Sequence, residues 1–411
     1  MYKVITILGT ISKTVKKPIY NFSKDLSKTY KLKKHSYTNM FTLLIDNFSD
    51  VLAIYTKKAK DIQEEVLKDE ELMYEFNSDF YIKDENDLDM AFKVINEAID
   101  KADDEFIIDL SHGFRHLPIL AIISLLSQNI QNPTRIKNIF FAKEITKFKE
   151  YEIIDLKELL DIANLSFILE NFNQNYTITK IEFSNPIYNI LADGLENLSH
   201  NILSNGIQNL YKENLLLETK NTLLQISKNK YFDCFKVNMD NTISYIDYLL
   251  SLEKELIYIR LLKISKDFAQ KGYMLNAITC LYEAAGYYSV AIIRHSSKEV
   301  SNSLYKFILK KSKNTNYLVT NFCISFIKNC SANRGNKNTN KVLSSEFDKQ
   351  IKNYLKNLKN YKNIQNLYKD LDKLRNNLAH ANSGDVVKNP HKKYENLSTK
   401  FEELILVDKN V

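Results

Sequence analysis

The chain has 411 residues, of which 44% are hydrophobic, enough for two or three separate cores and at least two domains. Only 8 residues are glycine and 5 are proline, which favours long helices and argues against extensive disorder. A formal net charge of +7 is compatible with a polyanionic partner, although charge alone is weak support for a nucleic acid.

The four cysteines include no CxxC pair, so we expect reduced thiols and no metal site. The apolar stretch at residues 1–9 is too short for a signal peptide, and the longest apolar run, Leu117 to Leu126, is too short to cross a bilayer. We therefore expect a cytoplasmic protein that does not contact a membrane.

The first 155 residues alternate short β-rich runs with helical patterns, which predicts a parallel, doubly wound sheet. The expected strands are Lys3–Leu8, Val51–Tyr55, Phe106–Leu110, Ile136–Phe141 and Glu150–Ile154, and the expected helices cover 39–48, 58–70, 87–101 and 117–130. Because Phe106–Leu110 is almost continuously apolar, we expect that strand to be central and covered on both faces. From about residue 160 onward only helical patterns follow, with a polar loop expected at Ser331–Ser345.

A polar loop follows the expected central strand. It reads Asp109-Leu110-Ser111-His112-Gly113-Phe114-Arg115-His116-Leu117-Pro118, and Pro118 falls in the first turn of the next helix. Ligands of open α/β sheets bind at this carboxyl edge, where a helix N-terminus attracts phosphate. The first strand ends in a similar run, Gly9-Thr10-Ile11-Ser12, so the two loops together predict a pocket for a nucleotide-like anion. The alternative is that His112 and His116 only cap the loop and Asp109 only fixes its turn.

Known fingerprints of other nucleotide or hydrolase sites are missing from the sequence. There is no GxGxxG run, no Walker A run and no GxSxG elbow. The loop therefore gives no reason to expect a dinucleotide, a nucleoside triphosphate or a serine hydrolase.

Near the C-terminus, one helical stretch combines an apolar stripe with a polar face. The stripe consists of Leu367, Leu371, Leu374, Leu378 and Ala381. Arg375, Asn376 and His380 lie off it, and on an ideal helix Arg375 and His380 are about 140° apart. One helix is therefore poorly shaped to aim both side chains at one atom, whereas two copies across a two-fold axis could do so.

Arg375 and His380 are suited to cutting RNA. The planar guanidinium of arginine binds phosphate through two parallel hydrogen bonds, and this chain has only six arginines among its 57 basic residues. Arg375 suits the stabilisation of phosphoryl charge and His380 suits the proton transfers, in a reaction that leaves a 2′,3′-cyclic phosphate and needs no metal. The alternative is that both side chains are solvated and inert.

Two resemblances follow from these motifs. The run Arg-Asn-x-x-Ala-His resembles the RxxxxH motif of HEPN-domain ribonucleases, with Asn376 in the polar position that often follows the arginine. In that family the motif sits at a dimer interface and two copies build one site. The run from Asp109 to Arg115 resembles the D-x-T-H-G-F-R signature of CRISPR-associated DxTHG proteins, whose N-terminal CARF domain is a Rossmann-like sensor. Ser111 stands where threonine is usual and keeps the hydroxyl.

The resemblance covers nearly the whole chain and implies an α/β plus all-α fold class. Its three regions would be a CARF domain at 1–160 with a parallel sheet, a helical connector at 161–245 and an all-α HEPN domain at 246–411. The implied protein is a homodimeric endoribonuclease that cuts single-stranded RNA in type III CRISPR antiviral defence. Its allosteric activator would be a cyclic oligoadenylate, with the tetra-adenylate favoured by family similarity.

The resemblance also assigns the site residues. The implied catalytic residues are Arg375, Asn376 and His380. The implied contacts to the cyclic oligoadenylate are Gly9, Thr10, Ser12, Asp109, Ser111, His112, Gly113, Phe114 and Arg115. No metal or other cofactor is implied.

Other functions stay open at this point. One is a CARF sensor that binds a partner without nuclease activity, and another is a protein whose CARF pocket also cleaves its own activator. A transcription factor ranks lower, because residues 176–245 contain only generic helices and no helix-turn-helix signal, so we expect no stable DNA partner.

Overall fold

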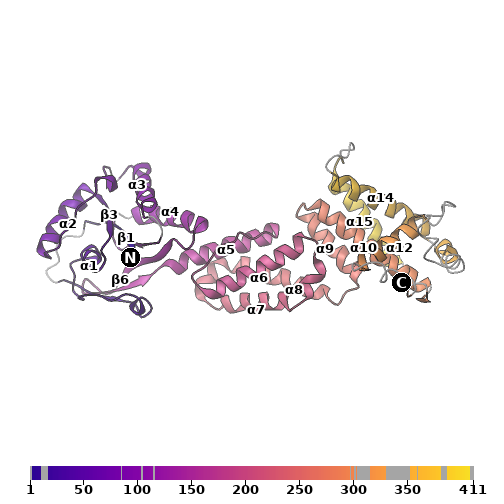
Figure 1. Cartoon of the computed structure of the whole chain (residues 1–411), viewed down its shortest axis with the longest axis horizontal. Helices are drawn as coiled ribbons and strands as arrows, with labels where there is room; N and C mark the ends of the chain where they lie inside the picture. Colours follow the sequence, from indigo (N-terminus) through magenta and orange to yellow (C-terminus); the bar gives the residue numbers. More distant parts are fainter. Residues whose placement is uncertain are drawn as a thin grey trace. The chain divides into compact units, whose positions relative to one another are not determined.

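The computed structural model describes residues 2–10, 17–84, 86–102, 105–113, 116–296, 298–299, 302, 315–329, 352–358, 360–380 and 387–407. The chain divides into two compact units (Figure 1): Met1–Ser199 with Leu217–Ile243, and His200–Leu216 with Ser244–Val411. The first unit contains an α/β domain, and the second is helical throughout its described part. The boundaries expected near residues 160 and 245 stay predictions, since both units take helices from the region between them.

The described part of the first unit contains a seven-stranded sheet with the order β2-β7-β6-β5-β1-β3-β4. Its strands are β1 (Lys3–Ile7), β2 (Ile19–Phe22), β3 (Val51–Thr56), β4 (Tyr81–Ile82), β5 (Phe106–Asp109), β6 (Ile136–Thr146) and β7 (Glu150–Asp155). The strand expected to be central, β5, lies in the middle of this order, between β1 and β6. That prediction is confirmed.

The sheet is not parallel throughout, and in this respect the prediction was wrong. β7 runs antiparallel to β6, and β2 pairs in parallel with β7. Only residues 147–149 connect β6 to β7, a length that allows a hairpin but no crossover. β2 and β4 were not predicted, because each is too short to show a clear pattern.

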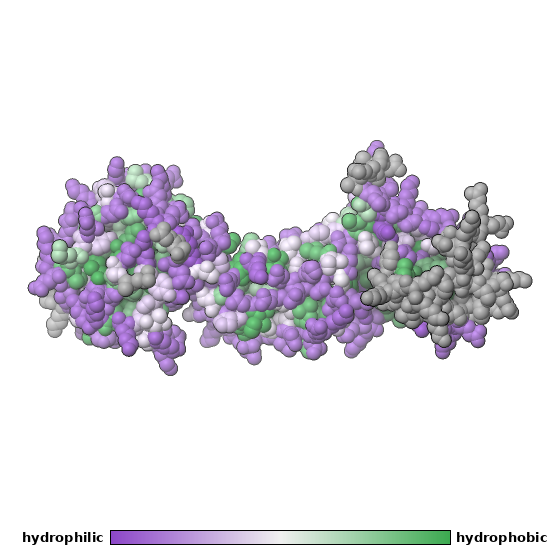
Figure 2. All heavy atoms as spheres, viewed as in Figure 1, coloured by the Kyte–Doolittle hydropathy of each residue, from purple (hydrophilic) through white to green (hydrophobic). Residues whose placement is uncertain are grey.

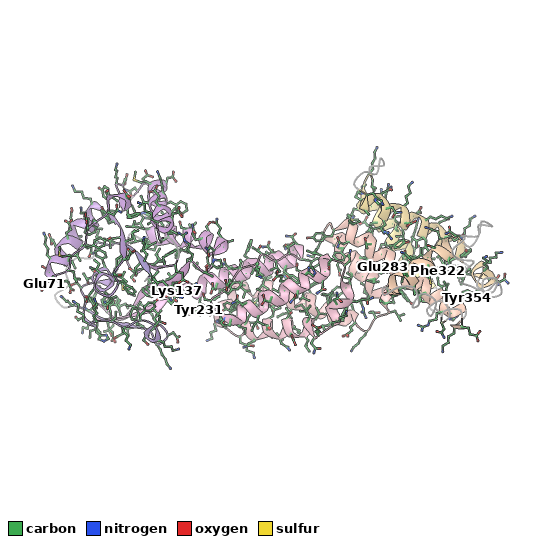
Figure 3. The ribbon with its side chains drawn as sticks, viewed as in Figure 1. Glu71, Lys137, Tyr231, Glu283, Phe322 and Tyr354 are labelled. Atoms are coloured by element: carbon green, nitrogen blue, oxygen red, sulfur yellow. The ribbon has the colours of Figure 1, made fainter. Side chains whose placement is uncertain are left out.

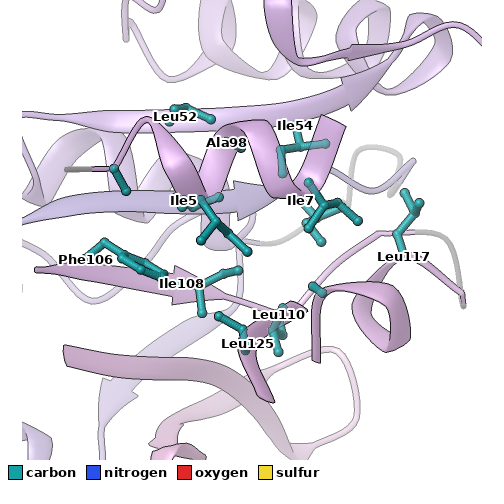
Figure 4. Packing of buried hydrophobic residues seen from close by; sticks show 14 of the residues in the cluster. Ile5, Ile7, Leu52, Ile54, Ala98, Phe106, Ile108, Leu110, Leu117 and Leu125 are labelled. Atoms are coloured by element: carbon teal, nitrogen blue, oxygen red, sulfur yellow. The ribbon is translucent and has the colours of Figure 1, made fainter. Parts of the chain in front are cut away.

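Helices cover both faces of the sheet. They are α1 (Met40–Asn47), α2 (Lys57–Asp69), α3 (Leu88–Asp100) and α4 (Leu117–Gln131). Alternate residues of each strand serve different cores, as the two-residue period of a strand requires. Phe106 and Ile108 pack with α3 and α4 in one core (Figure 4), whereas Ile107 packs with α1 on the other face. The continuous apolar run of β5 thus has its physical reason.

Beyond Asp155 the described residues form helices and no strand, as predicted. The helices are α5 (Lys157–Asn175), α6 (Pro186–Leu203), α7 (Leu215–Ile226), α8 (Lys236–Leu252), α9 (Ile257–Gln270), α10 (Met274–Ser296), α12 (Thr315–Asn329), α14 (Tyr361–Ala379) and α15 (Pro390–Val407). The polar loop expected at Ser331–Ser345 lies outside the described residues. The face of the molecule in Figure 2 is mostly hydrophilic. Among the described residues, none of the helices has the length and apolar character needed to cross a membrane.

Candidate functional site

Asp109, at the carboxyl end of β5, is hydrogen-bonded to β1 and to the turn at Ser111, and through Ser111 to β6. Its side chain is completely buried. The Thr6 hydroxyl donates to Oδ2 at 2.7 Å, and the Ser111 N–H donates to Oδ1 at 3.0 Å. The Ser111 hydroxyl also donates to Oδ1 and accepts from the Ala142 N–H at 2.8 Å. These bonds fix the turn after β5, so the structure favours a positioning role for Asp109 over direct ligand contact.

His112 connects this turn to the start of α1. Its Nε2 accepts from the Met40 N–H at 3.4 Å. Burial lowers the pKa of His112, an effect that nearby Asp109 opposes, and burial raises the pKa of Asp109. Because Nε2 is an acceptor, the neutral imidazole carries its hydrogen on Nδ1. His112 is therefore an uncharged ring beside the positive end of a helix.

The two glycine loops meet, as the sequence predicted. A Cβ atom on Gly9 would lie 3.1 Å from the backbone nitrogen of Gly113. Gly113 has a φ of +119°, and a Cβ atom there would lie 2.9 Å from Cγ2 of Ile7. Gly113 therefore needs glycine, and a side chain at Gly9 would require the backbone of Gly113 to shift. Thr10 is partly exposed beside them, whereas Ser12, Phe114 and Arg115 lie outside the described residues.

Two further polar residues lie at this edge that the sequence did not single out. Asn39 caps α1 by accepting from the Thr42 N–H, and its amide donates to Gln63 at 2.9 Å. Gln63 in turn donates to the Gly9 carbonyl at 3.4 Å. An asparagine before an apolar helical run is a recognisable cap, but Gln63 gives no signal in the sequence.

An ion cluster around the buried Glu70 carboxylate holds the segment that follows residues 11–16. The Glu70 carboxylate is fully buried and lies 3.0 Å from the Lys17 ammonium and 3.2 Å from that of Lys34. It also accepts from the Thr38 N–H and hydroxyl at 2.8 Å and 2.7 Å. Burial alone would raise the pKa of Glu70, but the bonds from Thr38 and the two lysines lower it to about 2. The carboxylate thereby anchors one end of the loop that carries Ser12.

In the second unit, α14 presents the other motif. Leu367, Leu371 and Leu374 are buried, as the predicted stripe requires, and Leu378 is partly buried. The fifth stripe residue, Ala381, lies outside the described residues. Tyr368 accepts from the Ser289 hydroxyl of α10 at 2.8 Å. Such contacts fix the rotation of α14 about its axis.

Arg375 faces α10. Its guanidinium carbon lies 4.5 Å from the centre of the Tyr282 ring, a cation–π contact. The next residue of α10 is Glu283 (Figure 3), whose pKa is raised by burial and lowered by the charge of Arg375 and by Thr320. Arg375 as a whole is half-buried, and the contact with Tyr282 fixes the position of its guanidinium.

His380 and Asn376 are exposed and do not share the environment of Arg375. The helix ends at Ala379, one residue short of His380, whose backbone is extended with φ −101° and ψ 105°. The expectation of a helix through residue 381 was therefore wrong. Asn382-Ser383-Gly384 follow in the sequence, and such residues favour turns over helix. The His380 N–H still donates to the Asn376 carbonyl at 3.1 Å, so its Cα keeps its helical place.

Comparison with protein-family models finds none that matches this chain, and comparison with curated proteins finds no similar sequence. In the part of the chain that the structure describes, no three His, Cys, Asp or Glu side chains are grouped so that they could hold a metal ion.

Proposed function

We propose that this chain is a homodimeric endoribonuclease that a cyclic oligoadenylate activates, with a CARF-like sensor in the first unit and a HEPN-like nuclease in the second. The observation that carries the proposal is the arrangement at α14. Arg375 is held against Tyr282, and His380 is exposed just beyond the helix end. A guanidinium and an imidazole so arranged are half of a metal-independent RNA-cutting site.

The edge of the sheet supports the sensor. The Gly9 and Gly113 loops meet there, α4 follows the polar turn in the chain, and the N-terminus of α1 contacts the turn through the Met40 N–H and His112. Helix N-termini and closely approaching glycine backbone are suited to phosphate. The five adjacent strands β6, β5, β1, β3 and β4 are parallel, which gives this edge the position where open α/β sheets bind ligands.

An apolar face of α4 supports the dimer. Ile119, Ile122, Ile123 and Ile130 are 59%, 40%, 50% and 40% exposed, although Leu117, Ala121 and Leu125 already bury the opposite side of the helix. A helix that is apolar on both sides needs a second partner. Since α4 begins directly after the polar turn, a two-fold contact along it would bring two turns around one ring-shaped ligand.

The proposed chemistry is an internal transfer at one phosphate of the RNA. The 2′-oxygen attacks phosphorus, the bond to the 5′-oxygen breaks, and a 2′,3′-cyclic phosphate and a 5′-hydroxyl result. Arg375 would stabilise charge on the non-bridging oxygens. His380, from either copy, would take the 2′-proton or supply the proton that the 5′-oxygen needs. Asn376 would orient one of these groups.

The test uses purified full-length protein, labelled single-stranded RNA, and cyclic tetra- and hexa-adenylate. Activator-dependent cleavage with cyclic phosphate ends is expected, and His380→Ala should abolish it while activator binding stays unchanged. His391→Ala is the matched control, because His391 is an exposed histidine on α15 outside the motif. Binding without cleavage would support a sensor instead, and residual activator-dependent cleavage by His380→Ala would remove His380 from the site.

A further inference from the structure

A groove runs between α14 and α15 on the side of α14 that faces away from Tyr282. One part, of about 270 Å³, is lined by Asp370, Lys373, Leu374, Asn377, Val387, Lys393, Asn396, Leu397 and Lys400. A second part, of about 420 Å³, shares Asp370 and Lys400 with the first and continues toward Asn360 at the start of α14. The two parts therefore lie next to each other along the helices.

The first part of the groove has a basic rim and an apolar floor. Lys373, Lys393 and Lys400 are exposed, and Leu374 and Leu397 are buried beneath them. Asp370 is the carboxylate among the residues that line it. In the second part Glu403 joins Asp370, so the positive charge is concentrated in the first part.

These three lysines differ from others nearby. Lys328 lies 2.7 Å from Asp372, and Lys266 lies 2.6 Å from Glu402. Within the described residues, by contrast, no carboxylate comes within ion-pair distance of the ammonium groups of Lys373, Lys393 and Lys400. Among the described residues, nothing neutralises these three charges, so an external anion can bind them.

The basic part of the groove lies beside His380. Asn377 lines it, and His380 follows three residues later with its N–H still in the helical pattern. Residues three apart are neighbours on a helix surface, about 5–6 Å between their Cβ atoms. A chain that lies in the groove would therefore lead to the imidazole.

We propose that single-stranded RNA occupies this groove, with its phosphates on Lys373, Lys393 and Lys400 and its bases or sugars against Asn377 and Asn396. The assignment rests on the proposed nuclease function and adds the path by which the substrate reaches His380. Lysine ammonium groups hold phosphates as point charges, and side-chain amides pair with base edges and sugar hydroxyls. Base edges and sugars can reach side-chain amides and the apolar floor when the strand is unpaired, so the groove suits a single strand better than a duplex.

The test measures binding of a fluorescein-labelled, unpaired RNA by anisotropy at several salt concentrations, in full-length protein carrying His380→Ala so that the RNA stays intact. The groove variant is K373E with K400E. The matched control, K362E with K392E, alters the same two helices by the same charge at exposed lysines outside the groove. Two lost phosphate contacts should weaken binding by about 25-fold at about 0.1 M salt and reduce the salt slope by about 1.4.

Equal affinity in the two variants, or an unchanged salt slope for the groove variant, would overturn the RNA path. K373Q with K400Q repeats the measurement without adding carboxylates beside Asp370, in case the reversed charges disturb folding. A second copy of the chain is the other possible occupant of the groove, and sedimentation velocity on the same proteins tests for it. If only the groove variants dissociate into monomers, the groove is an interface between copies and the proposal fails. Groove-dependent binding without cleavage by the wild type would instead refute the nuclease and leave the groove intact.

Discussion

Two inactive variants, Arg375→Ala and His380→Ala, should regain RNA cleavage when one protomer of each forms a mixed dimer. Arg375 lies over Tyr282, and His380 is exposed beyond the end of α14. Five residues and 140° of helix place their Cα atoms about 9 Å apart, with the side chains leaving on different sides. Both must approach one phosphate to about 3 Å. We therefore expect each histidine to work with the arginine of the other copy.

Dimers with one copy of each variant keep one of two symmetry-related pairings, so their initial rate should be about half that of the wild type. Each variant alone should lose at least about 100-fold. The mixed dimers are isolated through two different affinity tags, and activator-dependent cleavage of labelled RNA is measured. A mixed dimer as inactive as its parents would show that both residues act within one protomer, and the half-site reasoning would be refuted.

Three other outcomes follow from the first unit. Bonds from Thr38 and two lysines hold the pKa of Glu70 at about 2 instead of 4.5, which at about 1.4 kcal/mol per unit contributes about 3 kcal/mol to stability above pH 4.5. Glu70→Gln should lower the free energy of unfolding by that amount at pH 7, as measured by urea unfolding. The difference in unfolding free energy between wild type and variant should shrink as the pH falls from about 4.5 toward 2. A difference that does not depend on pH would contradict the assignment. Gly113→Ala places a Cβ atom 2.9 Å from Ile7 at a φ of +119°. The substitution should therefore lower the free energy of unfolding by about 1–3 kcal/mol and weaken activator binding in calorimetry. Unchanged values of both would show that the turn adapts. Ile123→Lys should leave the folded protomer intact within about 0.5 kcal/mol but shift sedimentation toward the monomer, and an unaltered dimer would place the interface elsewhere.

The sequence predicted those parts of the fold whose burial leaves a local pattern. β5 was recognised as central because burial on both faces requires apolar residues at every position. β2 has four residues and owes its existence to pairing with β7, about 130 positions later in the chain. Such a strand depends on its partner more than on its own composition, so no local pattern predicts it.

At the candidate sites, sequence found the motifs but not the role of every residue. Asp109 was expected among the ligand contacts, and its complete burial instead makes it the anchor of Thr6 and Ser111. The contact between Arg375 and Tyr282 joins residues 93 positions apart through the packing of two helices. Helical spacing predicted that Arg375 and His380 diverge, but it contained no information on what Arg375 faces.

The proposed switch also has an energetic requirement. Moving a dimer from about 1% to about 99% active needs a preference of the activator for the active arrangement of about 5.5 kcal/mol. At residues 109–113, buried hydrogen bonds and close glycine packing already fix the turn, so little of that free energy can come from ordering this segment. Rearranging the buried Asp109 would break several hydrogen bonds, and each buried polar group left without a partner costs about 1–3 kcal/mol. In the proposed dimer, the preference would therefore arise chiefly from how one ring-shaped ligand contacts two preformed turns at once. The proposed activator would then select the spacing between the two copies and not the shape of either turn.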